Sequence, residues 1–328
     1  MKYPRKLENN DIVGITAPSA GVGKYIDEYY KSVENIKNSG FKVIETESVK
    51  SKKEVSSSKK QRVKELNDLL LDDNVKAIIC ATGGDFLYEI MPYIDFNLIE
   101  QNPKWIMGAS DPTYLLYVIT TKLDIATIYG HNASSFDAEK LHISQQIALN
   151  TLKGIIEKQK SYDYYESNKE GRINNNYNLD SKVKWESNNN EIDVTGRIIG
   201  GCIDCLKLLP GTKYDNTKYF IEKYKNDGII WYFDIFSLSS EEFYLTLLQL
   251  NDIEWFKYIK AVIVGRVKYP STNTTMTYEK ALKKVFKNIP IIYNADIGHV
   301  PPKMTIINGS VANIKYKNNK GIITQYFK

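Results

Sequence analysis

The sequence has few of the residues that build disulfide scaffolds, zinc sites and membrane spans. Three cysteines among 328 residues are too few for a disulfide framework or a closed zinc site. Cys202 and Cys205 have the spacing of a redox pair, but we expect them to be buried free thiols. No apolar run is long enough to span a bilayer, and the N-terminus does not resemble a signal peptide. These absences predict a cytoplasmic protein that contacts no membrane.

The sequence also argues against binding of nucleic acids and of nucleoside triphosphates. The net charge of +5 comes from scattered lysines, and the lysine-rich run at 48–60 contains no arginine or aromatic residue, so we expect no nucleic-acid partner. Residues 18–25, PSAGVGKY, imitate a phosphate-binding loop. However, Pro18 replaces its first glycine, and Tyr25 replaces the Ser or Thr that would hold magnesium. The segment is therefore not that of a nucleoside triphosphatase.

Strands and helices alternate in the first half of the chain. Strands are expected at 11–17, 42–47, 76–81 and 105–107, and helices at 25–38, 59–72, 85–91 and 112–123. This alternation predicts an α/β fold, in which a mostly parallel sheet has helices on both faces and the site lies at the C-terminal strand ends. We divide the chain into a domain at 1–155, a polar connecting region at 156–195 and a second domain at 196–328.

Ser110 stands on a predicted strand-to-helix turn. The apolar strand at 105–107 stops at Gly108, and Pro112 suits the first position of the next helix. Such a turn exposes a serine hydroxyl, and the nearby helix N-terminus favours developing negative charge. Ser110 or Asp111 capping the helix is the simpler interpretation of this segment alone.

His299 is one of only three histidines and is followed by Val300 and two prolines. The prolines forbid a helix or a central strand there, so His299 is expected on a rigid loop after a strand. Histidine is the usual base for a serine nucleophile, because its pKa lies near neutrality. His131 and His142 are interpreted as structural.

Asp234 ends the apolar run at 229–234. A carboxylate at the edge of such a run is costly unless it is paired, and orienting an imidazole would pair it. A surface-facing aspartate is the alternative for this position. Glu241 and Glu242 are rival candidates for the acid, although they resemble the first turn of a helix.

The residues resemble those of the LD-carboxypeptidase family, the S66 serine peptidases. The resemblance extends from DIVGITAPSAG (11–21) nearly to the C-terminus, and it is most specific in GASDPT (108–113) and DIGHVPPKMTIINGS (296–310). IIGGCIDCLKLLPGTKY (198–214) also matches, and the subgroup of microcin C immunity peptidases is more similar than the short muropeptide enzymes. The family implies a Rossmann-like N-terminal domain, similar to class I glutamine amidotransferases, and a smaller C-terminal α/β swivelling domain.

The resemblance also implies the roles of individual residues. It matches Ser110 to the nucleophile, His299 to the base and Asp234 to the acid. A family glycine loop corresponds to Gly83 and Gly84, so the N–H groups of Gly84 and Asp111 are the predicted oxyanion hole. Substrate contacts are predicted for Gly83 and for Trp185, which lies in the family's cleft loop. The family implies no metal or cofactor, and a homodimer.

The chain departs from the family at two places. The acid is usually a glutamate, and the carboxylate of Asp234 reaches about 1.5 Å less far because one C–C bond is missing. The arginines expected in the following helix are absent, with Tyr244 and Leu245 in their place. These departures motivate one alternative from another class, a catalytically silent protein that binds ligand in the same cleft.

The sequence therefore predicts a serine hydrolase that cleaves an amide bond through an acyl-enzyme. The longer family type favours a peptidyl or aminoacyl nucleotide as substrate, as in microcin C self-immunity. A murein tetrapeptide cut during cell-wall recycling is the alternative. Both substrates are small molecules that carry an amino acid or a peptide.

Overall fold

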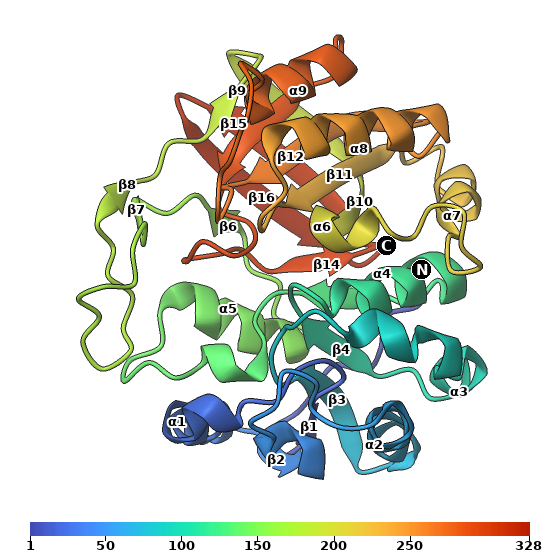
Figure 1. Cartoon of the computed structure of the whole chain (residues 1–328), viewed down its shortest axis with the longest axis vertical. Coiled ribbons are helices and arrows are strands. Elements are labelled where there is room, and N and C mark those ends of the chain that lie inside the picture. The colour runs from blue at the N-terminus through green and yellow to red at the C-terminus, as the bar shows by residue number, and fades with distance from the viewer.

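The computed structural model describes all 328 residues, and the chain forms two sheets stacked one above the other (Figure 1). The first is a six-stranded sheet in the order β14-β5-β4-β3-β1-β2. Its strands are β1 (Ile12–Thr16), β2 (Lys42–Glu45), β3 (Val75–Cys80), β4 (Trp105–Gly108), β5 (Thr127–Tyr129) and β14 (Ile306–Asn308). β1 to β5 run parallel, as the alternating pattern predicted, and the expected α/β class is confirmed.

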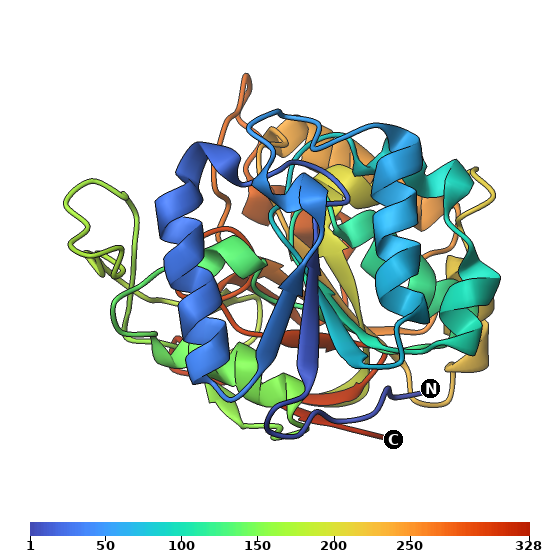
Figure 2. The same ribbon diagram turned by 90° about the horizontal axis from the view of Figure 1, so that it is seen from below.

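Helices cover both faces of this sheet (Figure 2). They are α1 (Ile26–Asn38), α2 (Lys59–Leu71), α3 (Phe96–Gln101), α4 (Thr113–Leu123) and α5 (Ile143–Leu152). Side chains of α1 and α5 belong to one apolar core, whereas α2, α3 and α4 belong to a larger core that continues into the second sheet. The inner strands β1, β3 and β4 are mostly apolar because both of their faces are buried, whereas the edge strand β2 is partly exposed.

The second sheet has eight strands in the order β6-β16-β15-β10-β11-β12-β13-β9. Its strands are β6 (Gln159–Lys160), β9 (Glu186–Ser187), β10 (Glu191–Cys202), β11 (Ile229–Asp234), β12 (Ile259–Gly265), β13 (Ile291–Ala295), β15 (Val311–Lys317) and β16 (Lys320–Tyr326). Its helices are α6 (Ile203–Leu206), α7 (Thr217–Lys223), α8 (Ser240–Asp252) and α9 (Tyr278–Val285). A separate small pair, β7 (Tyr164–Tyr165) and β8 (Ser181–Lys182), lies in the region between the two halves.

One strand of the C-terminal half belongs to the first sheet. β14 pairs antiparallel with β5, from Ile306 opposite Tyr129 to Asn308 opposite Thr127. The loop between β13 and β14 therefore passes from the second sheet to the first, and this loop carries His299. A division of the chain near residue 196 does not separate the two sheets.

Two expected details of the first half differ from the structure. The predicted α-helix at 85–91 is a 3-10 helix, Leu87–Tyr93, which contains Pro92. Proline cannot donate the hydrogen bond that continues an α-helix, so this segment stays in short turns. The sequence prediction also omitted α3, whose N-terminus is capped by the Asp95 side chain.

None of the helices combines the length and the apolar character that crossing a membrane requires.

Candidate active site

Ser110 lies on the turn between β4 and α4 with a left-handed backbone, at φ +69°. This conformation is costly for a residue with a side chain and is a common feature of functional turns. The N–H of Thr113 donates to the Ser110 carbonyl at 2.8 Å and closes the turn. A Cβ atom added to Gly83 would lie 3.0 Å from the Ser110 Cβ and 3.1 Å from its Oγ, so glycine leaves room beside the hydroxyl.

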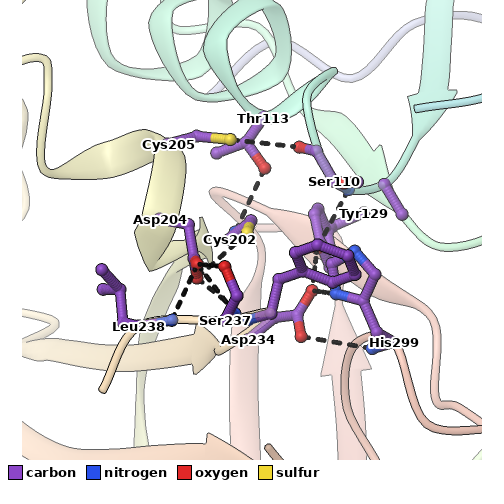
Figure 3. A network of polar contacts seen from close by, with 12 residues as sticks. Ser110, Thr113, Tyr129, Cys202, Asp204, Cys205, Asp234, Ser237, Leu238 and His299 are labelled. Atoms are coloured by element: carbon purple, nitrogen blue, oxygen red, sulfur yellow. Dashed lines mark hydrogen bonds and ion pairs between the residues drawn. The ribbon is translucent and has the colours of Figure 1, made fainter. Parts of the chain in front are cut away.

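Asp234 and His299 come together from the ends of β11 and β13 (Figure 3). The His299 Nδ1 lies 2.7 Å from the Asp234 Oδ2, and the His299 backbone N–H donates to Oδ1 at 3.2 Å. The ring contact is close in distance, but Nδ1 is not aligned as a hydrogen-bond donor, and Nε2 has no partner in the protein. The carboxylate is fully buried and the imidazole is partly exposed. Burial alone would raise the pKa of Asp234, but His299 and Tyr129 hold this pKa below its usual value.

Gly298 allows the close approach of His299 to Asp234. Its φ is +98°, and an added Cβ would lie 2.0 Å from the Asp234 Oδ1. Any other residue would displace either the carboxylate or the loop. The position before the histidine therefore requires glycine for steric reasons.

Tyr129, at the end of β5, connects the acid with the serine turn. Its hydroxyl donates to the Asp234 Oδ2 at 2.5 Å and accepts the Ser110 backbone N–H at 3.2 Å (Figure 3). The sequence analysis missed this residue, because a tyrosine that ends an apolar strand has the pattern of a core residue. Its partners Ser110 and Asp234 become visible only in the fold.

The Asp111 side chain ties the serine turn to the glycine loop. It is buried, accepts the Leu87 N–H at 2.8 Å and forms a short hydrogen bond with the Ser19 hydroxyl. Burial raises the pKa of this carboxyl to about 6. The backbone N–H groups of Gly84 and Asp111 have no acceptor in the protein. Both are thus free to donate to a ligand.

Ser110 and His299 line the same cavity, which has a volume of about 490 Å³. Gly83 and Gly84 form part of its wall, as predicted for a loop opposite the serine. The remaining walls come from several segments. The sequence did not single out Asp137, Lys169, Arg172, Tyr177 and Lys303 among their polar residues, and it gave His131 a structural role. Three of these lie in the connecting region at 156–195, whose polar composition was the one signal available.

Trp185 does not line this cavity, so the structure does not bring it to the substrate contact that the resemblance implied. Its side chain is completely buried, and its Nε1–H donates to the Asp296 Oδ2 at 2.9 Å. The indole packs against the backbone of Gly321, where an added Cβ would lie 1.9 Å from the ring. Trp185 is a core residue because Asp296 gives its N–H a buried partner.

The other candidates of the sequence analysis have different surroundings. Glu241 and Glu242 lie in the first turn of α8, where Glu242 forms a capping box with Ser239. His142 caps α5 and is structural, as predicted. His131, by contrast, is fully buried at the cavity with both ring nitrogens unpartnered, and burial lowers its pKa well below the usual range.

Cys202, Asp234 and His299 place one donor atom each within 4.8 Å of one another, which is a spacing that metals accept. All three cysteines are free and buried, as expected from the sequence. A contact with Cys205, together with burial, raises the pKa of the Cys202 thiol well above its usual value. Both oxygens of Asp234 are already occupied by His299 and Tyr129. A carboxylate whose two oxygens already have partners fits a metal poorly.

Comparisons with known proteins give matches over most of the chain. The sequence model of the LD-carboxypeptidase N-terminal domain matches residues 13–130, and that of the C-terminal domain matches residues 195–314. The putative carboxypeptidase YocD of Bacillus subtilis is 27% identical over 95% of this chain and 96% of its own length. The microcin C7 self-immunity protein MccF of Escherichia coli is 26% identical over 98% and 95% of the two chains.

The solved structures extend this similarity to the whole fold. A crystal structure of an MccF-like protein from Bacillus anthracis has a TM-score of 0.84 and 27% identity and covers 100% of both chains. MccF in complex with aspartyl sulfamoyl adenosine has a TM-score of 0.81 over 99% of this chain. At 21% identity this second similarity shows the fold alone.

Proposed function

Because the chain belongs to the LD-carboxypeptidase family, we propose that it is a serine carboxypeptidase with Ser110, His299 and Asp234 as its triad. The observation that carries the proposal is the 2.7 Å contact between His299 and the buried Asp234 at the cavity that Ser110 also lines. Asp234 fixes the imidazole and stabilises its cation, although it is shorter than the family's glutamate. Tyr129 holds the carboxylate by a hydrogen bond, and the absence of a side chain at Gly298 lets the histidine loop come close to the shorter acid.

The reaction proceeds through an acyl-enzyme. His299 takes the Ser110 proton as Oγ attacks the amide carbonyl. The oxyanion that forms accepts hydrogen bonds from the free N–H groups of Gly84 and Asp111. His299 then gives its proton to the leaving nitrogen, and the C–N bond breaks. Water attacks the ester next and passes a proton to His299, which returns it to Ser110. The products are a carboxylic acid and an amine.

The proposed substrate is an aminoacyl or peptidyl nucleotide. The relative MccF is named for microcin C7 self-immunity, and structures of MccF hold aspartyl sulfamoyl adenosine and glutamyl sulfamoyl guanosine. A murein tetrapeptide is the alternative, since a probable murein peptide carboxypeptidase of Bacillus subtilis is 31% identical over 39% of this chain.

We propose a cytoplasmic location, which suits three free thiols, and a homodimer, which sedimentation velocity would test.

Two measurements test the activity. Mass spectrometry of the products, with an aminoacyl sulfamoyl adenosine and a muropeptide side by side, identifies the substrate class. A fluorophosphonate probe should label the wild-type protein at Ser110 and leave Ser110→Ala unlabelled. A wild-type protein that is neither labelled nor able to hydrolyse either substrate would instead be a silent binding protein.

A further inference from the structure

The cavity beside Ser110 has a strong excess of positive charge. Four cationic side chains line it, Lys24, Lys169, Arg172 and Lys303, against a single carboxylate, Asp137. Arg172 is paired with Glu166, and Lys24 lies near Glu54 at 3.9 Å. The buried Asp234 beneath the wall is already occupied by His299 and Tyr129. Lys303 and Lys169 therefore have no ion-pair partner, although Asp234 attracts Lys303 and Asp137 attracts Lys169 from a longer distance.

Lys303 follows His299 by four residues on the loop between β13 and β14 and is partly buried. Its ammonium makes no hydrogen bond and no ion pair in the protein. An ammonium withdrawn from water without a partner is costly, so such a group is a candidate for binding an external anion. Burial lowers the pKa of Lys303 to about 8, with repulsion by Lys169 adding to this shift and attraction by Asp234 opposing it. An anion bound near both lysines would relieve this repulsion.

His131 provides a second, independent observation at the same wall. Both of its ring nitrogens are buried without a partner, although buried polar groups are normally hydrogen-bonded. Burial, together with the nearby positive charge of Lys303, disfavours the protonated imidazole, so His131 is neutral and has one N–H to donate. An unpaired ammonium and an unpaired imidazole thus lie together in the cavity that holds the serine.

We propose that Lys303 and His131 form a subsite for an acidic oxygen group of the substrate. The proposal rests on the function proposed above and adds the residues that select the substrate. The group is either the terminal carboxylate of a peptide or the acidic linkage between an amino acid and a nucleoside. Lys303 supplies the charge, His131 donates a hydrogen bond, and Lys169 at the cavity edge adds attraction.

Two pairs of substrates test the subsite and separate its two possible sources. One pair is a tetrapeptide with a free C-terminal carboxylate and the same peptide as a carboxamide. The other pair is an aminoacyl sulfamoyl adenosine, which is acidic, and the neutral analogue with an amide linkage at the 5′ carbon. Lys303→Met should lower kcat/KM about 10- to 100-fold for the acidic member of one pair, through KM, because charged hydrogen bonds contribute in this range. The neutral member should change less than about threefold.

Three controls make the result decisive. Lys315→Met, on the exposed face of β15, changes the net charge equally and should leave the preference for acidic substrates intact. His131→Gln, which keeps a donor, should retain more of this preference than His131→Leu. Fluorophosphonate labelling of Lys303→Met should still occur at Ser110, which shows that the serine site remains assembled in this variant.

Equal losses on acidic and neutral substrates, or no loss on either, would overturn the subsite while leaving the hydrolase intact. If the wild-type protein is neither labelled nor active, the proposed function fails instead. In that case calorimetric titration with the acidic sulfamoyl adenosine still decides the subsite. The subsite predicts that the wild-type protein binds this ligand and that Lys303→Met weakens the binding at least tenfold. No binding, or binding that Lys303→Met leaves unchanged, would contradict the subsite.

Discussion

At the scale of single residues, one hydroxyl group joins the serine turn to the buried acid. Tyr129 accepts the Ser110 backbone N–H and donates to Asp234, so it orients both without reaching the cavity. Tyr129→Phe removes both hydrogen bonds and should lower kcat at least about tenfold with little change in KM, because a hydrogen bond to a charged group alone contributes about 1.5 to 3 kcal/mol.

The matched control for this change is Tyr117→Phe. The Tyr117 hydroxyl is also buried and bonded, to Thr217 at 2.8 Å, but it lies in the core away from the cavity. It should cost stability and leave kcat unchanged. Steady-state kinetics of both variants test this role of Tyr129. An equal loss of kcat in Tyr129→Phe and Tyr117→Phe would contradict it.

Asp234→Asn tests the role of the acid directly. The neutral side chain cannot stabilise the imidazolium, so kcat should fall by about 10³- to 10⁴-fold. Circular dichroism serves as the folding control. A folded variant that retains more than about a tenth of the activity would show that another group orients His299.

The pH dependence of catalysis should report Lys303. Its pKa is lowered to about 8, so the free protein loses this charge as the pH rises through 8, whereas an exposed lysine would keep it. Asp234 opposes this shift and Lys169 favours it. With an acidic substrate, kcat/KM should fall above about pH 8, and the neutral analogue should lack this decline. The same profile with both substrates would contradict the assignment.

Residues that stand at element ends could be predicted from the sequence, and residues defined by distant partners could not. Ser110 follows an apolar strand, and His299 precedes two prolines, so each has a local signal. Tyr129 and Trp185 have no such signal. Their roles depend on Asp234 and Asp296, which lie more than 100 residues away in the sequence.

At the scale of elements, the loop between β13 and β14 decides how the site is assembled. It carries Gly298, His299 and Lys303 from the second sheet to the first. Gly298→Ala should abolish most activity, because the new Cβ would meet the Asp234 Oδ1 at 2.0 Å. A left-handed backbone with a side chain adds about 1 to 2 kcal/mol of instability.

Gly211→Ala is the matched control for that backbone cost. Gly211 also has a positive φ, +79°, but an added Cβ would meet nothing within 4 Å. The Gly211→Ala variant should lose stability through the backbone conformational cost alone and should keep its activity. Thermal unfolding and kinetics of both variants separate the two effects, and equal activity in both would refute the steric argument.

Element types followed from hydrophobic periodicity more reliably than from local propensity. β1, α1 and α2 lie within two residues of their expected ranges, because long apolar patterns determine them. The segment after Gly84 was predicted as an α-helix and is a 3-10 helix, since Pro92 prevents a regular continuation.

At the scale of the whole molecule, the two halves share one core. An apolar cluster of 64 residues extends from α2 and α4 into the second sheet. β14 crosses to the first sheet, which a sequence division near residue 196 did not predict because strand pairing at such separation has no local signal. Calorimetry should therefore give one cooperative unfolding transition, and two separate transitions would contradict a shared core.

The central claim is that Ser110 carries the acyl group during turnover. Rapid acid quenching with substrate in excess, followed by peptide mass spectrometry, measures this directly. The account predicts an added mass equal to the acyl part of the substrate on the peptide that contains Ser110, and none in Ser110→Ala. Hydrolysis without this adduct, or an adduct on another residue, would contradict it.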